Sequence, residues 1–443
     1  MRRVLPRSLA RWAAAVLSLA AASAGIRPAA AQQRTLTDEI DRRVALVMPK
    51  VIGWRRDIHQ HPELGNRETR TAKLVADHLR VLGIEVRTGV SRTGVVGVLR
   101  GGKPGPVVAL RADMDALPVT EEVDLPFKSL VKSTFAGQAV GVMHACGHDA
   151  HTAMLMGVAE VLAGLKAQLP GTVKFIFQPA EEGPPSGETG GAAVMVTEGV
   201  LENPAVDAVF GLHVWPEEPG KISYKAGGAM SAADGLQIIV KGKQTHGAQP
   251  WHGVDPIVVS AQIVNGLQTI TARQTDITVA PAVVTIGTIN GGIRFNIIPD
   301  SVVMTGTIRT FDAEMRKDVH MRITRTAEKI AEASGATAVV KITVGSEMLF
   351  NDLALTERMG PTIRRVTGGK VNTNGIWMPS EDFSAYHKKI PGLFVFLGVN
   401  KAGVSKDDAA PNHSPKFFVN EDALPTGVRA MANLAVDYLS GGK

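Results

Sequence analysis

The stretch from Val107 to Asp115 reads VVALRADMD and decides the expected fold. Its continuous apolar start predicts a strand buried on both faces, as in the sheets of α/β proteins. Two carboxylates, Asp113 and Asp115, follow directly at the end of this strand. Because α/β sheets place their ligand sites at the carboxyl ends of strands, the stretch also indicates where a site should lie. Taken alone, the carboxylate pair also fits a loop cap.

The same alternation of helix and strand patterns continues along the chain. Apolar residues at helical spacing predict helices over 38–61, 67–82, 148–165, 190–201 and 421–440. Apolar runs predict further strands over 94–99, 172–178, 206–213 and 393–398. Strands that alternate with helices predict an α/β sheet with helices on both of its faces.

A different order of elements begins after about Gly227. The pattern predicts strands over 234–241, 281–289, 301–310 and 337–344, with helices over 255–273 and 313–334. This β-α-β-β-α-β order is that of a ferredoxin-like split unit. Because α/β patterning resumes at 353–366, we expect residues 228–345 to be an insertion into a catalytic domain formed by 32–227 and 346–443.

The composition excludes several classes of protein. The chain has 443 residues, of which 44% are hydrophobic and 20% are charged, as is ordinary for a globular protein. Its length predicts two or three domains. The single cysteine, Cys146, rules out an internal disulfide scaffold. Beyond the N-terminus, no apolar run reaches the roughly 20 residues that a membrane-spanning helix needs, which excludes a polytopic membrane protein.

The first 31 residues have the three parts of a secretory signal peptide. Arginines form the n-region, an apolar stretch runs from about Trp12 to Ile26, and three alanines precede Gln32. The alternative is an uncleaved membrane anchor. We expect cleavage after Ala31 and a periplasmic or secreted protein.

The formal net charge of +6 depends largely on this leader. Five arginines and no Asp or Glu fall within the first 31 residues, so the remaining chain carries a formal net charge of +1. A nearly neutral chain gives no electrostatic reason to expect a nucleic-acid partner. Once the leader is removed, no membrane partner is expected either.

Imidazole, thiol and carboxylate groups gather between Met143 and His151, in the segment MHACGHDAH. Cys146 and His148 flank a glycine, and both can face one ion where the chain turns. A lone thiol outside the cytoplasm is protected when a metal binds it as a thiolate. A single histidine is more often solvated or structural, but the density of this segment favours a metal site.

Further ligands are expected at other strand ends. Glu181 and Glu182 follow the strand over 172–178, and such a pair can divide the roles of metal ligand and general base. On its own, the pair is more often two solvated glutamates. His213 and His413 also follow apolar stretches. The convergence of such loops is what a two-metal hydrolytic site needs.

Six motifs then occur in the order of a known family. They are DMDALP at 113–118, MHACGHDAH at 143–151, FQPAEE at 177–182, GLHV at 211–214, NIIPD at 296–300 and SEDFS at 380–384. Over roughly residues 38–440, the sequence resembles the aminoacylase/glutamate-carboxypeptidase family of dinuclear metallopeptidases. Within that family it is similar to the hippurate hydrolases and the auxin-conjugate (indole-acetyl-amino-acid) hydrolases. The resemblance implies a mixed-sheet, zinc-peptidase-like catalytic domain interrupted by a ferredoxin-like lid and dimerisation domain.

The resemblance also implies roles for residues of the catalytic domain. Two divalent metal ions (Zn, Mn or Co) are expected, with the ligands Cys146, His148, Glu182, His213 and His413. Cys146 is expected to bridge the two ions. Glu181 matches the general base, and Asp115 matches the aspartate that orients a metal ligand.

The inserted domain carries a second set of matched positions. His246 corresponds to the histidine that polarises the scissile carbonyl, often from the partner subunit. Asn296 and Arg309 correspond to positions that grip the substrate carbonyl and carboxylate. The resemblance therefore implies a homodimer through the inserted domain.

The sequence departs from the family pattern at two places. The loop over 183–189 is longer than in typical relatives and lies next to the expected site, which bears on the acyl preference. Trp251 and His252 replace a small segment at the expected pocket rim. His144, His151 and His252 have no ligand counterpart, and we expect them to be structural or rim residues.

These observations predict an exported metal-dependent amidohydrolase. Its expected substrates are N-acyl amino acids, hippurate-like or indole-acetyl conjugates, which it splits into a carboxylic acid and a free amino acid. The alternative within the same class is a metallo-carboxypeptidase or dipeptidase acting on short peptides. A hypothesis of another class is a binding or metal-storage protein that shows no turnover.

Overall fold

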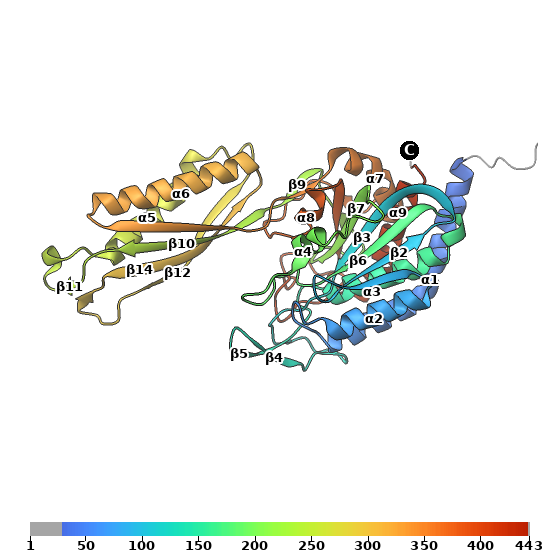
Figure 1. Cartoon of the computed structure of the whole chain (residues 1–443), viewed down its shortest axis with the longest axis horizontal. Coiled ribbons are helices and arrows are strands. Elements are labelled where there is room, and N and C mark those ends of the chain that lie inside the picture. Colours follow the sequence, from blue (N-terminus) through green and yellow to red (C-terminus); the bar gives the residue numbers. More distant parts are fainter. Residues whose placement is uncertain (1–28, 442–443) are drawn as a thin grey trace, which may run out of the picture.

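The computed structural model describes residues 29–441 of the chain. The predicted signal peptide, residues 1–31, lies outside the described residues except for its last three. Figure 1 shows two units side by side, a larger one around an eight-stranded sheet and a smaller one around a four-stranded sheet. Between residues 29 and 441, no helix has the length and apolar character needed to cross a membrane.

The larger unit is built on a mixed sheet with the strand order β1-β2-β6-β3-β7-β18-β8-β17. The strands are β1 (Glu85–Val90), β2 (Gly94–Arg100), β3 (Lys103–Asp113), β6 (Pro170–Gln178), β7 (Ala208–Trp215), β8 (Ile222–Ser223), β17 (Val371–Asn372) and β18 (Gly392–Gly398). The central strands β6, β3, β7 and β18 run parallel, and β1 and β2 are antiparallel to their neighbours.

Helices cover both faces of this sheet. One face packs against α1 (Ala29–Gln60), α2 (Thr69–Val81), α3 (His148–Ala163), α7 (Leu353–Val366) and α9 (Leu424–Leu439), and the other against α4 (Gly191–Thr197) and α8 (Ser384–His387). Neighbouring residues of one strand therefore enter different cores: Leu110 belongs to the first and Ala109 to the second. Burial on both faces explains why these strands are apolar throughout.

The smaller unit has the β-α-β-β-α-β order expected from the sequence. Its elements are β10 (Ala232–Lys241), α5 (Pro256–Thr269), β12 (Ala282–Gly291), β14 (Ser301–Thr310), α6 (Ala313–Ala333) and β15 (Thr337–Val344). The sheet is antiparallel in the order β12-β14-β10-β15, and both helices lie on one face of it (Figure 1). A separate core, which includes Ile238, Ile263 and Ile323, joins the sheet to the helices.

The chain passes between the two units through a short ladder. β9 (Gly227–Met230) leads into the smaller unit, β16 (Leu349–Asn351) leads out of it, and the two strands pair with each other. This ladder lies next to the boundaries expected at 228 and 345. The division of the chain into these domains, and the function of the smaller one as a lid or dimerisation domain, stay predictions.

Several elements differ in length from the prediction or were not predicted. The helix expected over 190–201 ends at Thr197, because Gly199 adopts a left-handed φ of 77°. The helix expected over 421–440 begins with a 3₁₀ turn, Glu421–Ala423, before α9. The short pairs β4 (Lys132–Phe135) with β5 (Gln138–Gly141), and β11 (Thr245–His246) with β13 (Ile297–Ile298), were not predicted. Strands of two to four mostly exposed residues carry no apolar alternation that could reveal them.

Candidate metal centre

A tight turn at the start of α3 presents two of the expected ligands. Gly147, between Cys146 and His148, has a φ of 87°, and a Cβ at this position would lie 2.2 Å from the side chain of Val214. Only glycine fits this turn, because it alone combines a left-handed backbone with such close contact. The turn places the thiol and the imidazole on the same side of the chain.

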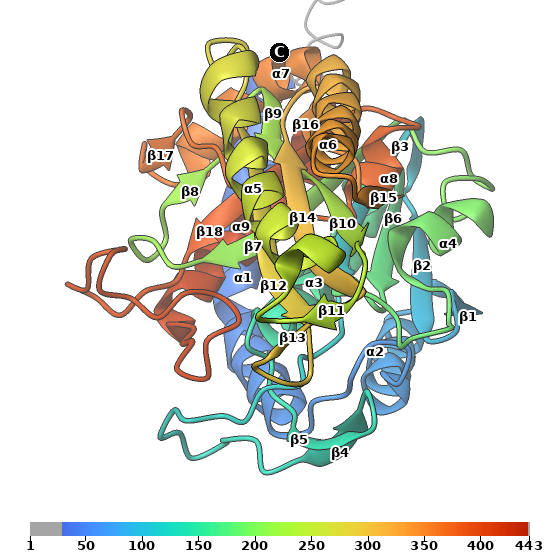
Figure 2. The same ribbon diagram turned by 90° about the vertical axis from the view of Figure 1, so that its left-hand side faces the viewer.

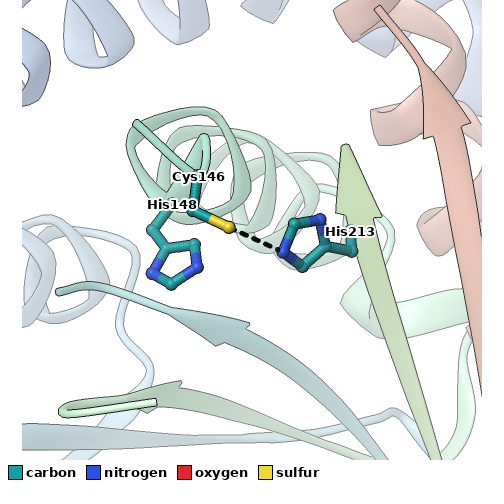
Figure 3. A group of neighbouring side chains, drawn as sticks. All are labelled: Cys146, His148 and His213. Atoms are coloured by element: carbon teal, nitrogen blue, oxygen red, sulfur yellow. Dashed lines mark hydrogen bonds between the residues drawn. The ribbon is translucent and has the colours of Figure 1, made fainter. Parts of the chain in front are cut away.

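The β7 strand brings a third ligand to this turn. The Cys146 Sγ lies 3.4 Å from Nε2 of His213, and Figure 3 shows the thiol pointing at that ring with His148 beside it. Ligand atoms of the three residues all lie within 4.8 Å of one another, and all three side chains are buried. A thiol and two imidazoles at this spacing match the ligand set of a divalent transition metal such as zinc.

Cys146 also belongs to a second group of the same dimensions. Its sulfur, a carboxylate oxygen of Glu182 and an imidazole nitrogen of His413 lie within 4.8 Å of one another. Nε2 of His413 is 2.9 Å from Oε1 of Glu182. Since the thiol is shared by both groups, the five expected ligands form two adjacent sites with Cys146 between them. Their role as ligands stays a prediction.

Hydrogen bonds fix which nitrogen of each histidine is free to bind a cation. Nδ1 of His213 donates to the carbonyl of Val214 at 2.7 Å, which leaves the lone pair on Nε2. Nδ1 of His148 lies 3.1 Å from Asp115 Oδ1, and its buried Nε2 makes no hydrogen bond among the described residues. Such a carboxylate–histidine pair is the usual support of a metal ligand. Asp115 therefore lies where a residue that orients a ligand must lie.

His151 and His144 are placed differently from these ligands. Nδ1 of His151 is 2.5 Å from Asp113 Oδ1, and its Nε2 accepts the backbone N–H of Val214 at 2.7 Å. Both nitrogens of His151 are thus occupied. His144 is buried and belongs to none of the ligand groups among the described residues, and burial lowers its pKa to about 3. His252 is exposed and stacks edge-on against Trp251.

The electrostatics of the cluster suit bound cations. Burial, reinforced by the carboxylates of Glu182 and Glu181, raises the pKa of the Cys146 thiol well above its usual range. Burial lowers the pKa of His148, but the carboxylates of Asp113 and Asp115 outweigh it and raise that pKa to about 10. Burial lowers the pKa of His213. Buried anionic groups without matching cations are costly, and a divalent cation removes that cost. The residues therefore fit a dinuclear metal site.

Glu181 lies next to the expected ligands, and within the part of the chain that the structure describes it makes no ion pair with a lysine or arginine. Its Oε2 lies 3.9 Å from Nε2 of His148, and its Oε1 accepts the backbone N–H of Asp382 at 3.4 Å. Burial, followed by the charge of Glu381, raises the pKa of Glu181 well above its usual range. A carboxylate with a raised pKa beside a metal site suits proton transfer.

The motifs of the sequence do not reveal a largely buried set of residues behind Glu181. Arg111, Gln178, Glu381, Asp382 and Tyr386 join one another through hydrogen bonds. The SEDFS motif at 380–384 contains two of them, Glu381 and Asp382. The signal that could have found Arg111 is a charged residue inside an apolar strand, since such a residue must meet carboxylates in the core.

The three expected residues of the smaller unit are not part of this cluster. His246 lies on β11, and Asn296 directly precedes β13, which pairs with β11. Figure 1 shows β11 at the end of the unit that is farthest from the large sheet. Arg309 lies on β14. His246 is exposed, and its Nδ1 accepts the backbone N–H of Ala248 at 3.0 Å. Its Nε2 therefore carries a proton that can be donated.

Comparisons with known proteins agree with this geometry. Residues 109–437 match the model of peptidase family M20/M25/M40. Thermostable carboxypeptidase 1 of Saccharolobus solfataricus is 43% identical over 406 residues, which cover 91% of this chain and 99% of the relative. IAA-amino acid hydrolase ILR1-like 2 of Arabidopsis thaliana is 39% identical over 401 residues, covering 88% and 86%.

One similar solved structure is that of a dinuclear metal-binding peptidase. The crystal structure of a dinuclear metal-binding peptidase from family M20 of Bacillus subtilis is 37% identical, with a TM-score of 0.75, and the match covers 89% of this chain and 99% of that one. The family expected from the six motifs is thus confirmed, together with the mixed α/β fold and a dinuclear metal cofactor. The chain is a metal-dependent amide hydrolase that belongs to peptidase family M20/M25/M40.

Proposed function

We propose that the protein hydrolyses N-acyl amino acids to a carboxylic acid and a free amino acid. The observation that carries this proposal is the pair Glu181 and Glu182 at the end of β6. Glu182 lies with Cys146 and His413, while the carboxylate of Glu181 beside them makes no ion pair with a lysine or arginine among the described residues. In this proposal Glu182 is the metal ligand and Glu181 is the base.

Each group has a defined task in this proposal. Bound divalent cations supply Lewis acidity to the amide carbonyl and lower the pKa of a water. Glu181 accepts the proton of the attacking water and returns it to the leaving nitrogen. Asp115 holds the ring of His148 through Nδ1. Nε2 of His246 donates to the carbonyl oxygen, on which negative charge develops.

A cavity beside Glu181 supports an acyl group larger than acetyl. Its volume is about 790 Å³, and its walls include Glu181, Gly183, Pro184 and Val196. That size lies within the range of pockets for drug-sized ligands. Gly183 and Pro184 belong to the loop that is longer than in typical relatives, so this loop bears on the acyl preference. A hippurate-like or indole-acetyl conjugate is the proposed substrate.

A homodimer would bring His246 to a metal centre. β11 lies at the far end of the smaller unit, and the exposed side chains of Ile293 and Phe295 lie in the segment just before β13. β12 is an edge strand of the four-stranded sheet. An open edge next to exposed apolar side chains favours pairing with a second copy. We place the partner's contribution, together with Asn296 and Arg309, at the substrate carbonyl and carboxylate.

The second candidate function is that of a carboxypeptidase or dipeptidase. The relative at 43% identity is named a carboxypeptidase, which favours short peptides as substrates. The experiment that separates the candidates measures amino-acid release by the metal-loaded mature protein from N-benzoyl, N-acetyl and indole-acetyl amino acids beside plain dipeptides. Release from acyl conjugates alone supports the proposal, and release from dipeptides alone overturns it. Two bound metals with no release from any compound would favour a binding protein.

Export and metal identity belong to the same proposal. The leader supports cleavage after Ala31 and a periplasmic or secreted enzyme, which N-terminal sequencing of the protein from cell fractions would test. The ligand set of one thiol, three imidazoles and one carboxylate suits zinc, with manganese or cobalt as the alternatives. Metal analysis of the protein as isolated would decide among the three.

A further inference from the structure

The backbone N–H of Asp382 makes a hydrogen bond on which the position of Glu181 depends. It donates to Glu181 Oε1 at 3.4 Å, and no other hydrogen bond to this carboxylate exists among residues 29–441. The nearby carboxylates of Glu381 and Asp382 repel Glu181, since oxygens of all three lie within 4.8 Å of one another. A base in such surroundings keeps its place only if the donor beside it is firmly held.

The side chain of Asp382 is anchored from three elements. Its Oδ1 accepts from Arg111 of β3 at 3.0 Å and from Gln178 of β6 at 2.7 Å, and its Oδ2 accepts the backbone N–H of Ala192 in α4 at 2.8 Å. A Cβ on residue 191 would lie 2.6 Å from Oδ2 of Asp382. The backbone at the start of α4 can therefore approach Asp382 this closely only because Gly191 has no side chain. Asp382 is thus fixed relative to the sheet.

Arg111 extends this anchor to the metal-ligand side. Its side chain is fully buried; Nη1 donates to Asp113 at 2.5 Å and Nη2 donates to Glu381 at 2.8 Å. Asp113 in turn contacts His151 and lies 3.8 Å from Nδ1 of His148. The guanidinium of Arg111 therefore joins Glu381, which lies near Glu181, to Asp113, which lies near His148.

We infer that Asp382, held by Arg111 and Gln178, is a positioning residue that sets the place of Glu181 relative to the metal ligands. It acts through its backbone N–H and does not touch the substrate. The inference rests on the proposed role of Glu181 as the base. A displacement of a reacting group by about 1 Å can cost roughly 100-fold in rate, so a loosened Asp382 lowers kcat rather than substrate binding.

The test compares Asp382→Ala and Asp382→Asn with Tyr386→Phe in the metal-loaded full protein. Tyr386 is the matched control because its hydroxyl donates to Gln178 in the same set, and its side chain makes no hydrogen bond to Asp382 or Glu181 among residues 29–441. We expect Asp382→Ala to lower kcat per metal-loaded site by about 10- to 100-fold with KM within about 3-fold. Asp382→Asn keeps an acceptor for Arg111 and should lose less. Tyr386→Phe should stay within about 3-fold.

A double substitution distinguishes positioning from plain stabilisation of the fold. In a Glu181→Gln background, Asp382→Ala should cost almost nothing further, because residues that act through one group are not additive. Additive losses, or an unchanged kcat per metal-loaded site in Asp382→Ala, would overturn the inference.

Crystal structures supply a readout that needs no turnover. Glu181 should keep its place beside the N–H of residue 382 in the wild type and in Tyr386→Phe, and should shift in Asp382→Ala. An unmoved Glu181 in Asp382→Ala refutes the inference whatever the activity. A wild type inactive on every acyl conjugate and dipeptide, but with Glu181 displaced in the variant, would refute the proposed function alone.

Discussion

The two units of this molecule hold their expected site residues in opposite ways. In the larger unit, Cys146, His148 and His213 are buried and oriented by their neighbours. In the smaller unit, His246 is exposed, and Arg309 is half-buried on an open sheet. Burial lowers the pKa of Arg309, and the charge of Asp234 opposes this only in part. The first set is preorganised within one chain, whereas the second lies apart from that set in the described residues.

Removal of the metal ions should have the largest effect on turnover, because the expected site of the larger unit depends on them. Dialysis against a chelator should reduce turnover to the background rate, since every proposed step needs the bound cations. Turnover before and after the addition of zinc, manganese or cobalt measures this effect, and the metal that restores it identifies a working cofactor. Full activity in protein shown by metal analysis to be free of metal would contradict the site.

Glu181→Gln tests the division of labour within the glutamate pair. The amide cannot accept the proton, so kcat should fall by about 100- to 10,000-fold. Because Glu182 rather than Glu181 lies with Cys146 and His413, metal content should remain at two ions per chain. Metal analysis alongside kinetics checks both statements. Loss of one metal in this variant would mean that Glu181 is a ligand.

His246→Ala tests the exposed site residue of the smaller unit. We expect kcat to fall by about 100-fold, the cost of losing one donor to a developing oxyanion, with the melting temperature unchanged. The exposed His252 of the same unit offers a matched control, and His252→Ala should change kcat by less than about 3-fold. Both variants are compared by kinetics and thermal unfolding.

Co-expression of His246→Ala with Glu181→Gln shows which subunit supplies the imidazole. If His246 acts on the partner's metals, a mixed dimer contains one site with both groups intact and recovers activity. If His246 acts within its own chain, no site in the mixed dimer is intact. Absence of recovery in a purified mixed dimer would therefore reject action across the subunits.

Asp255→Ala should have the smallest effect and separates the stability of the smaller unit from its chemistry. Asp255 caps α5 by accepting the backbone N–H of Ile257 at 2.9 Å. Loss of such a cap should lower the free energy of unfolding by about 1 kcal/mol. Chemical denaturation measures this change, while kcat should stay within about 2-fold. A large loss of kcat would show that the position of α5 matters for catalysis.

The elements of the fold were predictable where burial leaves a strong pattern. The apolar run at Val107 predicted β3, and the apolar pattern over 234–241 predicted β10. The hairpin β4–β5 was not predictable, because its residues are mostly exposed and nothing in their pattern depends on the fold. The end of α4 at Thr197 depended on a single glycine conformation that no periodicity reveals.

The sequence by itself determined the chemistry of the site. Short motifs hold Cys146 beside His148 and Glu181 beside Glu182, because these groups are neighbours along the chain and their geometry is local. Only the tertiary structure decided which distant groups support them. Arg111 and Glu381 meet although 270 residues separate them, and β11, which carries His246, lies apart from the expected metal ligands. Contacts of this kind depend on how strands and units pack, and Figure 2 shows the smaller unit in front of the larger one without joining its sheet.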